Sequence, residues 1–555
     1  MKNKFIYFAV LAALGFASCE PEFENEVTNA SYSAGEADFS SYVAVGNSLT
    51  AGFMDGTVSR GGQAYSYPNL LAQKFSLVGG GEFTQPYFGD DVNNLGGLML
   101  GGNPIDEDLS TPEIENKFKT RLVIDFSSGG PEPIAGPSTI EISAGRAGAV
   151  NNMGVPGAKS FHLLAAGYGN IAGVVPGLSN PYFVRHASDP MATVLGDAMS
   201  KNPTFFTNWI GSNDVLSYAT SGGVGVDHNQ TGNTNPATYG GNDITNTNVF
   251  ASVYSTIVNT LTSNGAKGVV ATIPSVTSIP YFTTVPYAPL TAQGIGKGLV
   301  PAGSDAATQI AAGTAAMNQL NAQLYNNLDA VFTAFGEPNR VNPLNPSSAN
   351  PLLIVDEDAA DRSAQITGGL MMQGVPGPVA SAIGAAFGKA RQTKSTDLVV
   401  LTASSAIGKP NANASATLVS LGANLTGVSY PMEDKWILIP SEKASIANAT
   451  ASYNATIKAI AASKGLAVAD MNAIMNRLIS GLRLEDGQIY TANYFSPSPN
   501  NFSTVLFSLD GVHPNPRGYA VIANEIIKVI NTHYKSKLPI HEVGGFPGIT
   551  ILGSN

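Results

Sequence analysis

Short apolar runs alternate with segments of helical periodicity along much of the chain. Residues 42–45, Tyr-Val-Ala-Val, form an unbroken apolar run that is typical of a buried strand. Other predicted core strands lie within residues 203–214, 267–274 and 465–470, and predicted helices within residues 67–75, 248–263, 441–464 and 506–530. Because strands that alternate with helices are joined by crossover connections, the pattern predicts a parallel sheet.

Two stretches interrupt this alternation. Residues 79–145 are rich in glycine and irregular, with strand-like runs at 120–127 and 139–142. Residues 286–434 combine a helical pattern over 306–335 with strand-like runs at 352–355 and 397–402. The predicted fold class is therefore α/β: a three-layer α/β/α sandwich with a short parallel sheet, flavodoxin-like in layout and enlarged by two insertions. We expect the second insertion to cover the rim of the sheet as a cap.

Composition narrows the classes of partner. The chain has 555 residues, of which 43% are hydrophobic and 12% charged, and this is enough apolar material for a sizeable core. The formal net charge is −11 and no basic tract is present. Because binding to a phosphate backbone requires clustered lysine and arginine, nucleic acid is not an expected partner.

The first residues predict export. Lys2 and Lys4 precede an apolar run over residues 5–17, which is too short to span a bilayer and typical of a signal peptide. The run ends at Cys19, the only cysteine of the chain. Residues 15–19, Gly-Phe-Ala-Ser-Cys, resemble a bacterial lipobox. The resemblance implies removal of residues 1–18, acylation of Cys19 and anchoring in the outer membrane; the alternative is an ordinary secretory signal with an incidental cysteine.

An acidic tether is predicted to follow the lipidated cysteine, over residues 19–38. Glutamates stand at positions 20, 22, 24 and 26. This pattern resembles the surface-export signals of Bacteroidetes lipoproteins, and it also fits a solvated linker in a protein that faces the periplasm. We take residues 39–540 as one domain with insertions at about 79–145 and 286–434, and residues 541–555 as a C-terminal tail.

Four stretches carry candidate chemistry. Ser48 lies in Gly-Asn-Ser-Leu directly after the first strand, where open α/β folds place their ligands. Gly157 lies in Asn-Met-Gly-Val-Pro-Gly, Asn213 in Gly-Ser-Asn-Asp, and Asp510 and His513 in Asp-Gly-Val-His. An aspartate three residues before a histidine can accept a hydrogen bond from Nδ1 and leave Nε2 free to take a proton from a serine hydroxyl.

Taken singly, each of these residues also has a structural interpretation. Ser48 could cap a helix, Gly157 could serve only a turn, and Asn213 could belong to an ordinary turn at the end of a strand. His513 could be a polar residue at the entry to a helix. The four stretches indicate a common site because they occur together in one chain and in a particular order.

That order and context resemble the SGNH/GDSL hydrolase family over the core segments, about half of the chain. The resemblance implies an SGNH-type fold in which Ser48 is the nucleophile, His513 the base and Asp510 its partner. It also implies an oxyanion hole made by the backbone N–H groups of Ser48 and Gly157 and the side-chain amide of Asn213.

Two departures from the family pattern stand out. Asn47 replaces the usual aspartate before the serine, a position that is not catalytic in the family. Gly157 is followed by Ala-Lys instead of the common Asp-Thr, and Gly154 is a nearby rival for the oxyanion glycine.

The sequence thus predicts a serine ester hydrolase that acts on lipid, acylated glycan or small-ester substrates and needs no cofactor or metal. The alternative is a surface lipoprotein that binds glycans or lipids without turnover. Other candidate sites are weaker: an acidic cluster, which fits a Ca²⁺ site less well than a solvated loop, and scattered histidines without metal-ligand spacing. The cluster comprises Asp356, Glu357, Asp358 and Asp361, and the histidines are His162, His186, His228, His533 and His541.

Overall fold

A five-stranded parallel sheet forms the centre of the molecule. The structure is a computed structural model that describes residues 31–106, 116–125, 130–145, 148–496 and 500–552. The strand order is β14 (Ala467–Ala469), β9 (Lys267–Ala271), β8 (Phe205–Trp209), β1 (Tyr42–Gly46) and β7 (Asn152–Gly154). All four pairings are parallel, which confirms the predicted mixed α/β fold with a parallel sheet.

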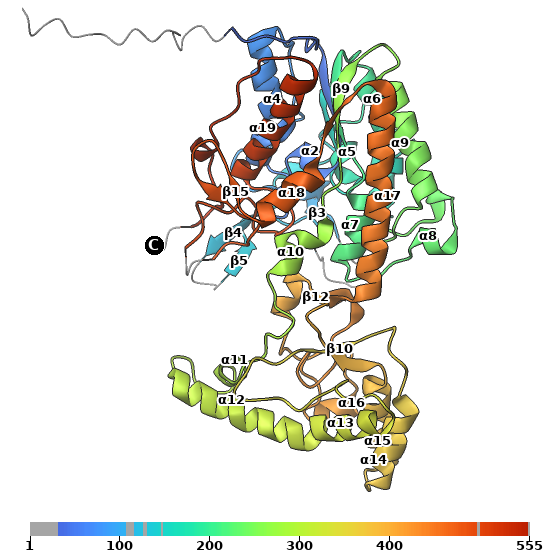
Figure 1. The fold of residues 1–555 in the computed structure, drawn as a ribbon, viewed down its shortest axis with the longest axis vertical. Coiled ribbons are helices and arrows are strands. Elements are labelled where there is room, and N and C mark those ends of the chain that lie inside the picture. Colours follow the sequence, from blue (N-terminus) through green and yellow to red (C-terminus); the bar gives the residue numbers. More distant parts are fainter. Residues whose placement is uncertain (1–30, 107–115, 126–129, 146–147, 497–499, 553–555) are drawn as a thin grey trace, which may run out of the picture.

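Helices cover both faces of this sheet (Figure 1). Two helices pack together on one side, α4 (Tyr67–Phe75) and α19 (Pro516–His533), and two on the other, α9 (Thr247–Leu261) and α17 (Pro440–Lys464). The other core helices are α2 (Ser48–Ala51), α3 (Arg60–Tyr65), α5 (Pro181–Val184), α6 (Val194–Met199), α7 (Asn213–Thr220), α8 (His228–Thr231) and α18 (Met471–Ile479). Every residue of β1 and β8 is buried, because strands covered on both faces have no solvent side.

The first insertion adds small β elements to one end of the core. Its strands are β2 (Leu98–Leu100), β3 (Asn103–Pro104), β4 (Leu122–Asp125), β5 (Gly130–Pro133) and β6 (Ile140–Glu141). They form a three-stranded sheet and an antiparallel pair, and the predicted strand-like runs contain β4 and β6. A short antiparallel pair, β15 (Leu482–Arg483) and β16 (Ile489–Tyr490), follows α18 later in the chain.

The second insertion forms a separate lobe that projects from the core below α10 (Pro280–Thr283) (Figure 1). It has its own hydrophobic cluster, which includes Tyr325, Phe332 and Phe387. Its helices are α11 (Ala292–Lys297), α12 (Ala306–Leu320), α13 (Asn326–Ala334), α14 (Ser363–Met372), α15 (Gly377–Phe387) and α16 (Ala416–Ser420). Its strand β10 (Leu353–Val355) pairs with β11 (Ala390–Gln392), and its strand β12 (Leu398–Val399) pairs with β13 (Ile437–Leu438), which directly follows the insertion.

Only the base of this lobe lies against the core. The run predicted as a strand at 397–402 contains the short strand β12 and then turns into a 3-10 helix, Leu401–Ser405. The Tyr281 backbone N–H of α10 donates to the carbonyl oxygen of Gly511 at 2.9 Å, and the Tyr281 hydroxyl lies 3.1 Å from the Thr402 hydroxyl. Tyr281 of α10 therefore links the lobe to the loop that carries Asp510 and His513, while most of the lobe extends away from the expected position of a cap.

Both ends of the described chain pack on the core. Residues 31–38 belong to the predicted tether, yet the Glu36 backbone N–H donates to the carbonyl oxygen of Tyr534 at 2.7 Å and Ala37 is buried. In the predicted tail, the His541 side chain is buried and Leu552 donates its backbone N–H to Ile124 at 2.9 Å.

The first 30 residues, with the predicted signal peptide, Cys19 and the glutamates that follow it, lie outside the described residues. Among the helices that the structure describes, none has both the length and the apolar character needed to cross a bilayer.

Candidate active site

Ser48 stands at the carboxyl end of the buried strand β1. The strand ends at Gly46, and α2 begins at Ser48. The Asn47 side chain caps this helix by accepting the Leu49 backbone N–H at 3.2 Å, so the residue that departs from the family pattern has a structural role here. The turn leaves the Ser48 hydroxyl at the rim of the sheet, as the sequence predicts.

His513 contacts Ser48, although the two residues are 465 positions apart in the sequence. Its Nε2 atom lies 2.9 Å from the Ser48 Oγ, and its Nδ1 atom lies 3.0 Å from Oδ2 of Asp510. The carboxylate can only accept a hydrogen bond, so Nδ1 carries the proton and Nε2 is the acceptor for the serine hydroxyl. The three side chains thus form a continuous relay from carboxylate to hydroxyl.

The loop around His513 is held by its own hydrogen bonds. Oδ1 of Asp510 accepts the backbone N–H groups of Val512 and His513, each at 2.8 Å. Asn515 then caps α19 by accepting the Gly518 backbone N–H at 3.0 Å, with Pro516 at the first helical position. The sequence Asp-Gly-Val-His-Pro-Asn-Pro therefore encodes a turn followed at once by a helix start.

Asp510 is held in its ionised form. Burial opposes ionisation, but the Coulombic interaction with His513 and the hydrogen bonds that the carboxylate accepts outweigh it, and they lower the pKa of Asp510 below its usual value. The Phe53 ring packs 4.5 Å from the imidazole of His513, centroid to centroid, and covers one face of it. The imidazole is thus fixed in position by a carboxylate and an aromatic ring.

Of the two candidate oxyanion glycines, Gly157 has the free donor. Gly154 ends β7, and its backbone N–H donates to Oδ1 of Asn152 at 3.0 Å. Gly157 adopts φ +78°, a conformation that glycine takes without strain. Within the described residues, the backbone N–H groups of Gly157 and Ser48 have no hydrogen-bond partner.

Asn213 begins α7, directly after the turn that ends β8. Its Nδ2 atom donates to the carbonyl oxygen of Ala158 at 2.9 Å, which ties it to the loop of Gly157. An amide nitrogen carries two hydrogens, so one remains for a ligand. Ser48, Gly157 and Asn213 thus lie on three neighbouring strand ends of one sheet.

Asp214 and Ser160 were not assigned roles from sequence, yet they fix this arrangement. The buried carboxylate of Asp214 accepts the Ser160 backbone N–H at 2.8 Å and the Ser160 hydroxyl at 2.7 Å. Burial raises the pKa of Asp214, and the two bonds from Ser160 oppose that rise. The sequence feature that could have indicated this role is the acidic residue directly after Asn213, at the start of α7.

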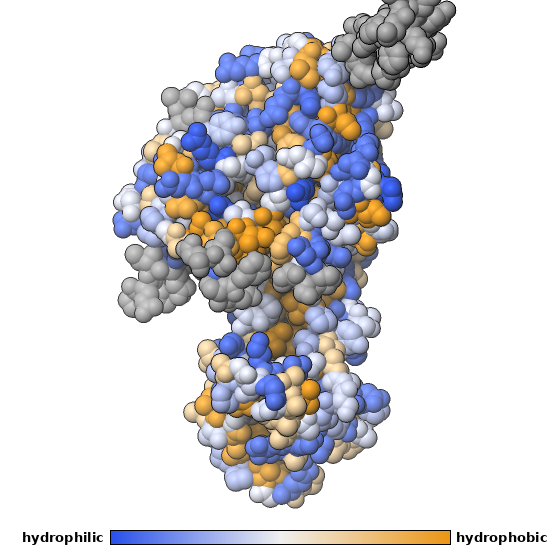
Figure 2. All heavy atoms as spheres, turned by 90° about the vertical axis from the view of Figure 1, so that its left-hand side faces the viewer, coloured by the Kyte–Doolittle hydropathy of each residue, from blue (hydrophilic) through white to orange (hydrophobic). Residues whose placement is uncertain are grey.

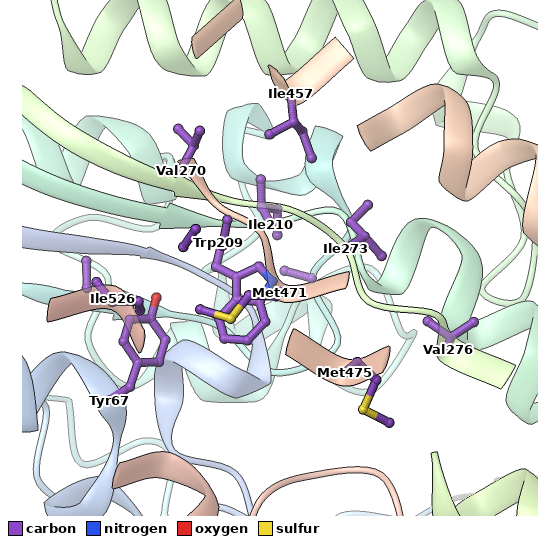
Figure 3. Close-up of a cluster of buried hydrophobic side chains, with 14 of the residues drawn as sticks. Tyr67, Trp209, Ile210, Val270, Ile273, Val276, Ile457, Met471, Met475 and Ile526 are labelled. Atoms are coloured by element: carbon purple, nitrogen blue, oxygen red, sulfur yellow. The ribbon is translucent and has the colours of Figure 1, made fainter. Parts of the chain in front are cut away.

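An apolar pocket is lined in part by the sequence neighbours of Ser48 and His513. It has a volume of about 110 Å³ and is lined almost entirely by carbon atoms. Leu49 follows Ser48 in the sequence, Val512 and Pro514 flank His513, and all three line the pocket together with Trp209, Met471 and Met475. Figure 3 shows Trp209, Met471 and Met475 within the buried cluster around the end of β8. Figure 2 shows that apolar side chains also gather on the surface of the core lobe just above the narrow junction with the second lobe.

The other candidates have structural partners. Of the acidic cluster, Asp356 pairs with Arg391, and the Asp361 side chain accepts the Ser363 backbone N–H at 2.8 Å. Glu357 instead approaches Asp434 and Glu442 closely enough for the three carboxyl groups to share one ion. Burial, followed by repulsion between these carboxylates, raises the pKa of Asp434 to about 7 and also raises the pKa of Glu442. A carboxyl group that keeps its proton repels a neighbouring carboxylate less, so the raised pKa values fit the close approach of these groups.

The remaining histidines of the prediction are spread over the molecule. His162 accepts the Lys159 backbone N–H at 3.1 Å and stacks on Tyr168, and burial lowers its pKa to about 4. His228 lies 2.8 Å from Asp243. Neither histidine contacts Ser48 or His513 in the described part of the chain, in agreement with a packing role.

A comparison of this chain with protein-family models, curated proteins and solved structures finds no match in any of the three.

Proposed function

We propose that the protein is a serine ester hydrolase of the SGNH type, in which Ser48 forms an acyl-enzyme. The observation that carries this proposal is the relay of 2.9 Å and 3.0 Å hydrogen bonds from the Ser48 Oγ through His513 to Asp510. A serine hydroxyl is a weak nucleophile until a base of this kind stands beside it. The order of the four motifs, which resembles the SGNH/GDSL hydrolases, supports the same conclusion.

The reaction proceeds in two halves. The Ser48 Oγ attacks the ester carbonyl carbon while its proton passes to Nε2 of His513, and Asp510 stabilises the imidazolium that forms. The imidazolium then gives this proton to the leaving alcohol as the C–O bond breaks, which leaves an acyl-enzyme. In the second half a water molecule loses its proton to His513, attacks the acyl carbon and releases the acid, and Ser48 regains its proton.

The oxyanion that forms in each half needs hydrogen-bond donors. The free N–H groups of Ser48 and Gly157 and the second amide hydrogen of Asn213 are available for this role. Donors that are already fixed before the reaction stabilise the developing charge without reorganisation. The Asn213–Ala158 and Ser160–Asp214 hydrogen bonds supply that fixation.

Asn213→Ala is expected to lower kcat for ester hydrolysis by about 10²–10³-fold, the usual cost of one oxyanion donor. KM should change by less than about threefold, because the donor acts mainly on the charge that develops in the transition state. The measurement is steady-state hydrolysis of p-nitrophenyl butyrate. Asn229→Ala, on the exposed helix α8, is the matched control. A kcat for Asn213→Ala within threefold of the parent value would contradict the role of this amide.

The apolar pocket favours an ester with an aliphatic acyl group. Its lining offers an aliphatic chain almost no hydrogen-bonding partners, and it includes Leu49, Val512 and Pro514, the sequence neighbours of Ser48 and His513. Each methylene that leaves water gains about 0.8 kcal/mol, which corresponds to about a fourfold gain in kcat/KM when the pocket holds it in the transition state.

We therefore expect kcat/KM to rise from acetyl to hexanoyl p-nitrophenyl esters, by about fourfold per methylene until the pocket is full. The measurement uses the protein that lacks residues 1–19. Met475→Gln, which makes the lining polar at nearly constant volume, should flatten this rise. Met372→Gln is the matched control, since Met372 is 87% exposed on the second lobe. A preference for acetyl esters would contradict the pocket as the acyl site, and binding of glycans without turnover of any ester would favour the non-catalytic alternative.

A further inference from the structure

A tight turn at residues 54–57 follows α2, the helix that begins at Ser48. The turn contacts the loop of residues 508–513, which we call the catalytic loop. Met54 and Thr57 exchange backbone hydrogen bonds at 3.0 and 3.2 Å, with Asp55 and Gly56 between them. Asp55 has φ +53°, an uncommon conformation that aspartate, asparagine and glycine tolerate best. Its side chain is nevertheless buried, although it forms no ion pair within the described part of the chain, and this is unusual for an aspartate. The turn thus holds a carboxyl group in a position that is costly to maintain.

Asp55 connects three segments of the chain through separate polar groups. Its backbone N–H donates to the Ser508 hydroxyl at 3.0 Å, and its Oδ1 accepts the Leu509 backbone N–H at 2.9 Å. Its carbonyl oxygen accepts the Leu122 backbone N–H at 2.7 Å, at the start of β4. The residue therefore fixes the catalytic loop to the segment that bears the nucleophile and to the first insertion.

The next residue reaches the catalytic carboxylate itself. The Gly56 backbone N–H donates to Oδ2 of Asp510 at 3.1 Å. The same oxygen lies 3.0 Å from Nδ1 of His513. A shift of the turn would consequently move the hydrogen bond that orients the base.

We propose that Asp55 is a positioning residue, which holds residues 508–513 against the nucleophile segment while it is protonated and loosens that hold when it ionises. The consequence for catalysis rests on the proposed function, but the effect on the loop does not. The physical reason is that a charged Asp55 is costly to keep buried, and its charge also lies beside the buried carboxylate of Asp510. A movement of the loop lets water reach Asp55 and separates the two carboxylates, so it relieves both costs.

The electrostatic surroundings agree with this assignment. Burial raises the pKa of Asp55 to about 7; the charge of Asp510 acts in the same direction, whereas the bond from Leu509 and the charge of Arg121 oppose it. The titratable groups that face Asp55 are Asp510 and His513 on the catalytic loop, Arg121 before β4, Tyr494, and Tyr519 on α19.

The sign of the pH effect follows from this raised pKa. The unfolded chain releases the Asp55 proton near its usual value of 3.8, while the folded protein keeps it up to about pH 7. Between these values the folded state binds more protons, so this group contributes stability at low pH that declines as pH rises towards 7. An asparagine at this position keeps the acceptor for Leu509 but cannot ionise.

The test uses three variants of the whole folded protein. Asp55→Asn removes only the ionisation, Asp55→Gly removes the acceptor while tolerating the positive φ, and Asp38→Asn is the same substitution at an exposed site. Hydrogen exchange of the backbone amides in residues 508–513 is measured at pH 6 and pH 8 and corrected for the intrinsic rates. Thermal unfolding of each variant checks that it is folded.

We expect the parent protein to lose protection of these amides by about tenfold between pH 6 and pH 8, the scale of one buried hydrogen bond. Asp55→Asn should show equal protection at both pH values, and Asp55→Gly should be unprotected at both. For ester hydrolysis, Asp55→Gly should lower kcat by about tenfold or more with little change in KM, and Asp55→Asn should restore it.

Two results would overturn the proposal: an Asp55→Asn variant that keeps the pH dependence of exchange seen in the parent, or an Asp55→Gly variant with unchanged protection. Because exchange needs no turnover, the two proposals fail separately. If the amides exchange as expected but the protein hydrolyses no ester, the proposed function is rejected. The positioning role of Asp55 is then retained.

Discussion

Ser48→Ala is expected to lower kcat for ester hydrolysis by about 10⁴-fold or more, the usual effect of removing the nucleophile from a serine triad. The variant keeps the backbone donors of the oxyanion hole and the apolar pocket, so substrate binding should persist with a similar affinity. In the structure the Ser48 hydroxyl contacts only Nε2 of His513 among hydrogen-bonding groups of the described residues. The measurement is initial-rate hydrolysis of p-nitrophenyl butyrate over a range of concentrations.

The unfolding temperature of Ser48→Ala should stay close to that of the parent protein, because the substitution removes one hydroxyl with a single hydrogen-bond partner among the described residues. Ser263→Ala, which removes an exposed hydroxyl at the end of α9, is the matched control and should keep full activity. A folded Ser48→Ala variant that retains more than about a tenth of the parent kcat would show that another group is the nucleophile.

Asp510→Asn is expected to lower kcat by about 10³–10⁴-fold, because it replaces the hydrogen-bond acceptor that faces Nδ1 of His513 with a donor. Oδ1 is already fixed by the backbone N–H groups of Val512 and His513. The new amide nitrogen must therefore take the place of Oδ2, where it would face Nδ1 of His513 and the Gly56 N–H. To avoid donor-to-donor contact, the imidazole must carry its proton on Nε2, and it then cannot accept the proton of Ser48.

The matched control for this substitution is Asp189→Asn. Asp189 accepts a backbone N–H two residues ahead at 2.8 Å, as Asp510 does, but lies in a loop outside the site. Its kcat and pH profile should match the parent. If Asp510→Asn instead kept a kcat within tenfold of the parent, the carboxylate would have no role in selecting the tautomer of His513.

Local sequence patterns were enough to predict the layers of the fold and most of its core elements. Residues 42–45 become part of a fully buried strand, because an unbroken apolar run has no charged side chain that must be removed from water when both faces are covered. The helix predicted at 248–263 ends close to Asn264-Gly265, where Gly265 adopts φ +81°. Ser48, Asp510 and His513 each stand in a short turn before or at the start of a helix, and the neighbours of each residue determine the geometry of that turn.

Contacts between distant segments could not be predicted in this way. The Asp-Gly pair at 55–56 signals a turn, but its role depends on hydrogen bonds to residues 454 positions away. The strand-like run at 397–402 is only partly a strand, since Leu401 and its neighbours instead form a 3-10 helix at the junction with α10. The position of the second lobe likewise depends on contacts at its junction with α10, which no local period encodes.

The most direct test of the account is covalent trapping of the nucleophile. The protein lacking residues 1–19 is treated with a fluorophosphonate, and the site of modification is mapped by peptide mass spectrometry. We predict one adduct per chain, on Ser48 alone, and its loss in a folded His513→Gln variant, because the hydroxyl reacts only when Nε2 of His513 accepts its proton. An unmodified Ser48, or an adduct on another residue at the same rate, would contradict the proposed mechanism.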